Sequence, residues 1–560
     1  MEHLHQMLPK LVLAAIVATS AGMFLLLMSS ADFSSHHEQY RRRRGLSLLA
    51  DLQDPKTVEL RPIIRKAFEN ENEITDIGIV QPPFLQSSSA IKPYTLDDAI
   101  LTAGAFQHAL FFFVYDASSD TFVVVTTQPG CTHGCGRMYS IASIVSVALR
   151  KNFPERFQGE QDLVLVITCS DAPRVWGTCL MQENNFCDSN LFAPILQFGS
   201  VFVNTEYLPS MIAMPVWNYP HLPCFNDWQL SDFGKMRGTC PELQVQEYFD
   251  ATNNQDYWDN LIPQVIWRGS DFLFLPLLYP HMTMPDLSGK ARHELGMDGH
   301  QFANEYEKKR WAIETLQAMG ERLMLRWRGV LMTSEAELEV SIENDQVLGG
   351  NNTKLLPWVN IKFTHCNMGG KFPVGKVEKY IEMQSLGISC IGDYVSMSDQ
   401  AKYKYHIDLG GGGGTTWTGT IQKLALPGVL FHHVTPTKDW FHDLLVPWEH
   451  YIPINTDLSD LRVKYEWAES HPEEARRISE NGTRFAQWMA SAEGFGHLYD
   501  TFLLAPLRVV MNAYRNPTPS DYEGKRVLDI ILESGKGEFT VVSTCSGLYM
   551  NSCTKKLRYR

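Results

Sequence analysis

Short apolar runs and segments with helical spacing alternate along most of the chain. Residues 109–115 and 121–127 are apolar runs joined by a turn-like segment, so they predict two strands. Residues 138–152 place apolar side chains at helical spacing, and the continuous run at 162–168 is typical of a strand buried on both faces. Strands separated by helices predict an α/β domain with a mostly parallel sheet.

A second block with the same alternation begins near residue 262. Its predicted strands are 264–267, 359–363, 403–409 and 428–433, and its predicted helices are 301–325, 376–383, 420–426 and 472–489. Two α/β blocks in one chain predict two Rossmann-like halves that face a cleft. In such folds ligands bind at the carboxyl ends of the strands.

The N-terminus has a different pattern. Residues 11–28 form an uncharged apolar run close to the ~18-residue threshold for a helix that spans a membrane. We interpret it as a retained anchor rather than a cleaved signal peptide, because no small-x-small site directly precedes a mature start. Arginines follow the run at Arg41 to Arg44, whereas only Lys10 precedes it. The positive-inside rule would therefore put the C-terminal side in the cytosol.

Length and charge narrow the classes of function. The chain has 560 residues, which is too long for one ordinary core, and 44% of them are hydrophobic. Its net charge of -14 argues against a nucleic-acid binder, because such a protein depends on Lys and Arg to neutralise phosphates.

Cysteines and glycosylation triplets bear on the compartment. Cys131, His133 and Cys135 resemble part of a metal site, but structural zinc needs four ligands and no second pair lies nearby, so a disulfide or a plain loop is favoured. In a lumenal protein several of the eleven cysteines would be bridged. Asn351 and Asn481 begin Asn-x-Thr triplets, which are glycosylation acceptors in form and favour a lumenal location only weakly.

Two candidate groups directly follow predicted strands. Asp171 comes after the strand at 162–168 and can take a proton from an attacking hydroxyl, although spacing alone favours an Asp that starts a turn before Pro173. Arg268, with Gly269 and Ser270, fits a diphosphate, because the guanidinium donates several hydrogen bonds and glycine lets the backbone approach. An ion pair with a surface carboxylate is the alternative. Another Trp-Arg-Gly at 327–329 ends a predicted long helix, which is a poorer position for a ligand.

A third candidate is a loop between a strand and a helix. Five glycines follow the strand at 403–409, and the helix start after them is rich in hydroxyls: Thr415, Thr416, Trp417, Thr418, Gly419 and Thr420. Backbone amides and a helix N-terminus together favour an anion. The segment matches neither the dinucleotide nor the Walker spacing, and a flexible loop is the alternative. A fourth segment, 447–461, is dense in charged and aromatic residues. Two interpretations are open: these residues line a sugar or nucleotide pocket, or they form an interdomain joint.

These segments, in this order, resemble glycosyltransferase family 90, the protein O-glucosyltransferase and capsule-associated family. The family carries a strand ending in an Asp-aromatic-Pro turn, which 167–173 resembles with Ala172 in the aromatic position. The other shared motifs are Arg-Gly-Ser at 268–270, Tyr-Lys-Tyr at 403–405, and a Pro-Trp-x-His-Tyr-x-Pro segment that ends in Asp-Leu-Ser, at 447–459. The resemblance runs from about 162 to 495 and is strongest over 402–461.

The resemblance implies a GT-B fold, with two Rossmann-like domains, and an inverting, metal-independent transfer from a UDP-sugar. Glucose or xylose would move to a hydroxyl of a protein or glycan, and the UDP-sugar is a co-substrate rather than a cofactor. It also implies that Asp171 is the base, that Arg268 and Ser270 face the donor, and that 415–420 form the pyrophosphate loop. The enzyme would work in the endoplasmic reticulum or Golgi membrane as a single-pass type II protein, which outweighs the arginines after the anchor.

One departure from the family lies in the pyrophosphate loop. Thr420 stands where the family has an arginine, and Thr418-Gly419 replaces a Ser-aromatic pair. We therefore expect Arg268 to carry more of the donor binding, with Lys423, one helical turn beyond Thr420, in second place. The departure also supports one alternative, an inactive family member that binds a glycan or a partner. A glycoside hydrolase is the other alternative, but it needs a second carboxylate that faces the first.

The predicted organisation follows from these patterns. It comprises a cytosolic tail (1–10), a transmembrane anchor (11–29), a stem (30–95), an N-terminal Rossmann-like acceptor domain (96–261), a C-terminal Rossmann-like donor-binding domain (262–505) and a tail of unknown role (506–560).

Overall fold

The first two predicted strands form a hairpin in the computed structural model of the chain. β1 (Leu110–Asp116) pairs antiparallel with β2 (Thr121–Thr126). Asp116 closes the turn, because its carboxylate accepts hydrogen bonds from the backbone N–H of Ser118 at 3.1 Å and from the hydroxyls of Ser118 at 2.6 Å and Ser119 at 2.9 Å. A connection this short joins antiparallel strands only, since parallel strands need a crossover.

The structure describes much of the chain after residue 92. The described residues are 93–105, 110–127, 135–159, 161–168, 193–197, 199–201, 211–213, 257–275, 279–287, 289–295, 297, 299–346, 355–365, 378–412, 416, 419–435, 437–490, 492–518, 521–536, 538–547 and 553–555. The predicted anchor at 11–29 and most of the predicted stem lie outside them. No helix of the described part combines the length and the apolar character needed to cross a membrane.

The N-terminal sheet is mixed. Its strand order is β14-β13-β2-β1-β3-β4-β6. β3 (Leu163–Thr168) runs antiparallel to β1 and parallel to β4 (Ile195–Gln197), which is parallel to β6 (Met211–Ala213). The predicted mostly parallel sheet is therefore wrong on the β1 side, where the hairpin fixes the direction of β2.

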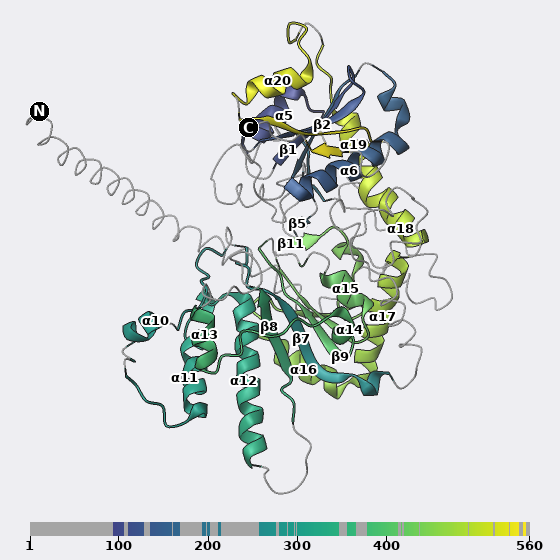
Figure 1. Cartoon of the computed structure of the whole chain (residues 1–560). Coiled ribbons are helices and arrows are strands. Elements are labelled where there is room, and N and C mark those ends of the chain that lie inside the picture. The colour runs from purple at the N-terminus through teal and green to yellow at the C-terminus, as the bar shows by residue number, and fades with distance from the viewer. Residues whose placement is uncertain are drawn as a thin grey trace, which may run out of the picture. The chain divides into compact units, whose positions relative to one another are not determined.

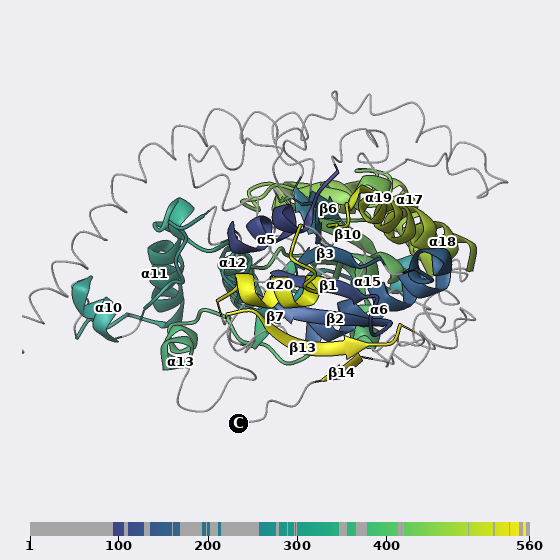
Figure 2. The same cartoon turned by 90° about the horizontal axis from the view of Figure 1, so that it is seen from above.

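The C-terminal segment, for which the sequence indicates no role, belongs to this sheet. β13 (Thr540–Cys545) pairs antiparallel with β2 and carries β14 (Cys553–Lys555) at the edge, as Figure 2 shows. The helices around this sheet are α5 (Leu96–Ala105), α6 (Cys135–Asn152), α19 (Ala505–Ala513) and α20 (Val527–Ser534). Residues near the start and near the end of the described part of the chain thus share one core, in which the Tyr94 and Tyr514 rings lie 5.4 Å apart.

The C-terminal sheet is parallel throughout. Its strands are β7 (Ile262–Ser270), β8 (Val359–His365), β9 (Tyr403–Asp408), β10 (Val429–His433) and β12 (Ile452–Ile454), in the order β12-β10-β9-β7-β8. The chain leaves β7 toward β8 on one side and then crosses to β9 on the other. The order therefore reverses between β7 and β9, and open α/β sheets bind ligands outside the carboxyl ends of the strands at this point.

The helices of this half of the chain lie around the sheet or farther out from it, as Figure 1 shows. They are α10 (Gly289–Glu294), α11 (Glu305–Gln317), α12 (Leu325–Gln346), α13 (Glu378–Ser385), α14 (Met397–Gln400), α15 (Gly419–Ala425), α16 (Leu461–Ser470) and α17 (Pro472–Ala490). The predicted single helix at 301–325 is wrong, because α11 ends at Gln317 and α12 begins at Leu325. Gly320 lies between them with a φ of 52°, a conformation that favours glycine.

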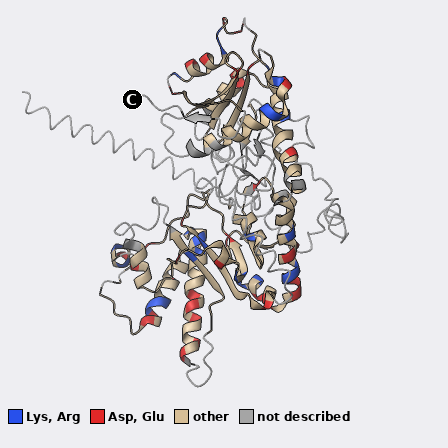
Figure 3. Ribbon diagram, turned by 45° about the vertical axis from the view of Figure 1, so that its right-hand side comes forward, with Lys and Arg blue, Asp and Glu red and all other residues tan. Residues whose placement is uncertain are grey.

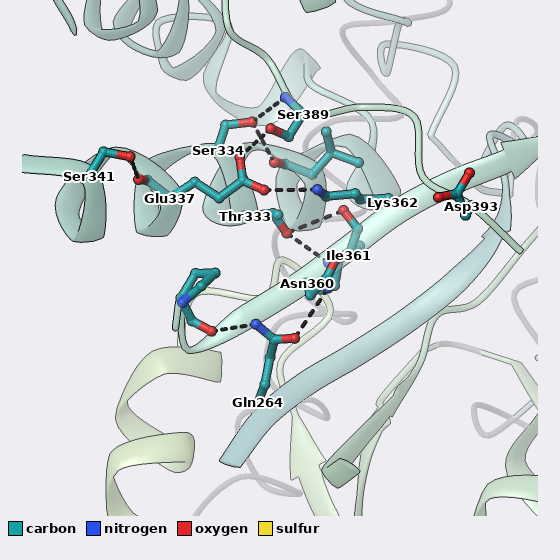
Figure 4. A network of polar contacts seen from close by, with 12 residues as sticks. Gln264, Thr333, Ser334, Glu337, Ser341, Asn360, Ile361, Lys362, Ser389 and Asp393 are labelled. Carbon is teal, nitrogen blue, oxygen red and sulfur yellow. Dashed lines mark hydrogen bonds and ion pairs between the residues drawn. The ribbon is translucent and has the colours of Figure 1, made fainter. Parts of the chain in front are cut away.

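A half-buried carboxylate ties α12 to the sheet, as Figure 4 shows for its contact with Lys362. Glu337 accepts hydrogen bonds from Lys362 on β8 at 2.8 Å, from Lys309 on α11 at 3.1 Å and from the hydroxyl of Ser389. Burial works to raise the pKa of Glu337, but the hydrogen bonds from Lys362 and Ser389 outweigh it, and the pKa is lowered. The ionised form is therefore stabilised by the fold.

We predict that Glu337→Gln destabilises the protein, because two ammonium groups then face a neutral amide. The free energy of unfolding, measured in urea at pH 7, should fall by ~2 kcal/mol. Since the folded pKa is the lower one, the wild type loses this stabilisation as the pH falls through the carboxylate range, and its difference from the variant should shrink there. Glu343→Gln is the control, because Glu343 is exposed on the same helix. Acidic residues recur along this helix, as the red segments in Figure 3 show. Equal losses in both variants would contradict the prediction.

Candidate functional site

Polar groups gather at the carboxyl ends of β7, β9 and β10. β7 ends at Ser270, β9 at Asp408 and β10 at His433. In register, His432 lies beside Asp408 on the neighbouring strand. This edge contains the point where the strand order reverses, so it is where the fold itself predicts a ligand.

Arg326 joins the ends of β7 and β9. Its guanidinium donates to the backbone carbonyls of Ser270 at 2.7 Å, Leu409 at 2.7 Å and Gly410 at 3.2 Å. It also lies 5.0 Å from the centre of the Trp267 ring, which suits a cation over an aromatic face. Burial lowers the pKa of Arg326 to about 10, so the side chain stays charged at neutral pH.

Asp408 connects the first turn of α15, where the loop ends, to the end of β10. It is fully buried and accepts from the hydroxyl of Thr420 at 2.6 Å, from His432 Nδ1 at 2.8 Å and from the backbone N–H of His433 at 2.9 Å. Burial works to raise the pKa of Asp408, but the contacts with His432 and Thr420 lower it well below its usual range. The carboxylate is therefore ionised.

His433 has a structural role at the same edge. Its Nδ1 accepts from the backbone N–H of Gly410 at 3.0 Å, and its Nε2 then donates to the carbonyl of Thr456 at 2.8 Å. Burial lowers the pKa of His433 to about 4, so the ring is neutral. With both nitrogens occupied, it fixes the first glycine of the loop.

The predicted donor-binding group Arg268 is held by the protein itself. It donates to the carbonyl of Trp267 at 2.8 Å, to the carbonyl and side chain of Asn360 at 2.8 and 3.1 Å, and to the carbonyl of Asp393 at 3.1 Å. Burial lowers the pKa of Arg268. Gly269 is required for packing, because a Cβ there would lie 2.4 Å from the Trp267 ring. Half-buried Ser270 offers its carbonyl to Arg326.

The predicted pyrophosphate loop is described in part. Thr416 and Thr420 share a hydrogen bond between their hydroxyls, and the latter is committed to Asp408. A Cβ on Gly419 would lie 3.4 Å from Lys423 Nζ, so the ammonium approaches the loop. Burial lowers the pKa of Lys423, and in the described part of the chain no group accepts a hydrogen bond from it. Lys423 is thus a basic group beside the loop with no hydrogen-bond acceptor among the described residues.

Other predicted site residues lie elsewhere. Asp171, Asn351, Thr415, Trp417 and Thr418 lie outside the described residues, and those predictions stay open. Asn481 lies inside α17 and is half-buried. The threonine of its triplet, Thr483, is buried, and its hydroxyl donates to the carbonyl of Leu426 at 3.4 Å.

Sequence reasoning missed Arg326, the histidines and the role of Asp408. The Trp-Arg-Gly at 327–329 was expected to end a helix, but it lies in the first turn of α12, and Arg326 directly precedes it. A signal that could have identified Arg326 is its position in the first turn of α12, next to the end of the sheet. His432 and His433 are polar residues at the end of an otherwise apolar strand, and Asp408 is the last residue of the strand beside it.

Comparison with known proteins bears on the same region. A sequence model described as Glycosyl transferase family 90 matches residues 379–496. Protein O-glucosyltransferase 2 of Danio rerio is 39% identical over 100 residues, which cover 17% of this chain and 18% of that protein. Protein O-glucosyltransferase 3 of Homo sapiens is 32% identical over 95 residues, 16% of this chain and 17% of that protein.

A viral protein also matches. Uncharacterized protein 035R of Invertebrate iridescent virus 3 is 29% identical over 112 residues, 20% of this chain and 10% of that protein. All these stretches span less than a fifth of the relatives' own length. The resemblance to family 90 expected from the sequence is confirmed by the match at 379–496, which contains β9, α15, β10 and β12.

We predict that Arg326→Lys destabilises the carboxyl edge of the C-terminal sheet. The compact ammonium of lysine cannot donate at once to carbonyls that follow two strands, as the planar guanidinium does. The free energy of unfolding, measured in urea, should fall by ~2 kcal/mol. Arg322→Lys is the matched control, since Arg322 lies exposed just before α12. Unchanged stability in Arg326→Lys would mean that the ties to the carbonyls contribute nothing.

Proposed function

We propose that this chain, with its glycosyltransferase family 90 segment, transfers a sugar from a UDP-sugar to a hydroxyl of a protein or glycan. The observation that carries the proposal is that the family match and an available basic group lie at the same edge of the sheet. The family match at 379–496 covers the strands on one side of the reversal point, and Lys423 lies there as a cation without an acceptor among the described residues. A nucleoside diphosphate needs such a group, since fixed charges that face the leaving group are the largest contribution in this kind of catalysis.

The proposed mechanism is an inverting, metal-independent displacement on a GT-B fold. Asp171, three residues beyond the end of β3, takes the proton of the acceptor hydroxyl, and that oxygen attacks the anomeric carbon from the face opposite UDP. Two sheets, one of them parallel with a reversal point, are consistent with two domains of this type. Metal independence rests on the family resemblance. Glucose or xylose is the proposed sugar because the relatives are named O-glucosyltransferases.

The secretory pathway is the proposed compartment, with residues 11–29 as a type II anchor and the catalytic domain in the lumen. Cys545 on β13 is disulfide-bonded. Disulfides persist in oxidising compartments and are rare in the cytosol, so this bond supports a lumenal location.

A second candidate is an inactive family member that binds a glycan or a partner. Two observations favour it: Arg268 has donated its hydrogen bonds to the protein, and the hydroxyl of Thr420 is committed to Asp408. UDP release from UDP-sugars, with the purified lumenal domain, separates the two. Binding of UDP without turnover would favour this second candidate.

We predict that Asp171→Asn abolishes transfer and leaves UDP affinity nearly unchanged. The amide keeps the shape of the carboxylate but accepts no proton, and loss of a general base costs ~10²–10⁴-fold in rate. UDP release and calorimetric titration of UDP measure the two quantities. Added chelator should leave turnover intact. Near-normal turnover in the variant would rule out the base, and a strict requirement for manganese would rule out metal independence.

We predict that Lys423 matters more for UDP than Arg268, the opposite of the order expected from the sequence. Lys423→Ala should weaken UDP binding at least ~10-fold, about 1.4 kcal/mol. Arg268→Ala should have a smaller effect on affinity, because that side chain is engaged by Asn360 and Asp393. Calorimetry on both variants decides the order. A larger loss in Arg268→Ala would mean that its side chain changes partners when UDP binds.

A further inference from the structure

His432 is the histidine of the C-terminal sheet that retains an unused nitrogen at the carboxyl edge. Its Nδ1 lies 2.8 Å from Asp408 Oδ2. The ionised carboxylate makes Nδ1 the donor, so Nε2, on the far side of the ring, is left for another partner. In the part of the chain that the structure describes, no group forms a hydrogen bond with Nε2.

Comparison with neighbouring histidines separates a structural ring from an available one. His433 uses both nitrogens within the protein. His406 bonds the carbonyl of Pro427 at 2.7 Å and is fully buried, so no ligand reaches it. The His432 side chain keeps 7% of its surface exposed, at the end of its strand. A nearly buried nitrogen without a partner is unfavourable unless a ligand completes it.

The position of His432 assigns it to one side of the reaction. Asp408 Oδ2 accepts from both His432 and Thr420, so the imidazole and the proposed diphosphate loop meet on one carboxylate. An inverting transfer has its base on the face opposite UDP, which excludes a general-base role for a ring on the diphosphate side. A positively charged ring held by a carboxylate suits a phosphate oxygen instead.

We propose that His432, positioned by Asp408, donates a hydrogen bond from protonated Nε2 to a phosphate oxygen of the bound nucleoside diphosphate. The inference rests on the proposed function and adds a pH-dependent contribution to donor binding. Lys423 approaches the loop with its amine, whereas His432 can donate from Nε2 only when its ring is protonated. UDP binding therefore weakens as the pH rises.

Several titratable and charged groups surround this ring. The rings of His442 and Tyr451 lie 4.8 and 4.9 Å from it, and Asp439 Oδ2 lies 4.0 Å from His442 Nε2. The charged or titratable groups around it are thus Asp408 on β9, Lys423 on α15, His442 and Asp439 before β12, Tyr451, and His433 on its own strand. Among the described residues, Asp408 is the one in direct hydrogen-bond contact with the ring.

Two substitutions test the contributions of the two His432 nitrogens separately. The amide nitrogen of Asn can replace Nδ1, and that of Gln can replace Nε2. His432→Asn keeps a donor for Asp408 but lacks the distal donor. His432→Gln keeps a neutral donor at the distal position. His471→Gln is the control, since His471 is exposed and stacks on Trp467 of α16.

UDP titrated by calorimetry from pH 6 to 8.5 tests the proposal. Wild type and His471→Gln should lose affinity about tenfold more across this range than His432→Gln, a difference that cancels the titration of UDP itself. At pH 6.5 His432→Asn should bind UDP about tenfold more weakly than wild type, with little loss of stability in urea. Parallel pH profiles for wild type and His432→Gln would overturn the proposal while leaving turnover, and so the proposed function, intact. A wild type that binds no UDP would overturn both.

Discussion

A buried guanidinium holds the carboxyl edge of the C-terminal sheet together. Parallel strands end in carbonyls that the ladder no longer pairs, and at the reversal point two such ends lie side by side without a shared helix above them. Arg326 donates to carbonyls from both, at 2.7 to 3.2 Å, and the Trp267 ring supports its flat face. The ladder pairs β7 with β9 up to Ile266 and His406, and Arg326 extends this connection to the carbonyls of Ser270, Leu409 and Gly410 beyond it.

This tie also determines which cations remain for a ligand. Arg326 donates to three backbone carbonyls, and Arg268 donates to carbonyls and to the side chain of Asn360, so the protein itself holds both guanidinium groups in place. The ionised Asp408 at the same edge repels an anion unless its charge is balanced. Lys423 and His432 both interact with Asp408 and provide that balance. Under the proposed function, the edge would receive the diphosphate chiefly through Lys423 and His432, which lie behind the loop, and less through Arg268.

The sequence predicts elements well where local patterns determine them. The apolar run at 162–168 is β3 (Leu163–Thr168), because a continuous apolar run suits a strand buried on both faces, and the strand predicted at 403–409 is β9 (Tyr403–Asp408). It fails where partners are distant. The Arg326 contacts join residues 56 to 84 positions apart, and β13 pairs with β2 across more than four hundred residues. No local periodicity carries such information.

The return of the chain to its first sheet limits how the protein can be divided. β13 and β14 cover the edge of the hairpin, and the strands of the parallel sheet lie in sequence between β6 and β13. The N-terminal sheet is thus complete only when the last strands have been made. Its β2 edge would otherwise present Phe122 to Val125, apolar residues that are buried in the whole chain. An uncovered apolar edge strand invites pairing with other chains, so the C-terminal segment protects the sheet from aggregation as well as extending it.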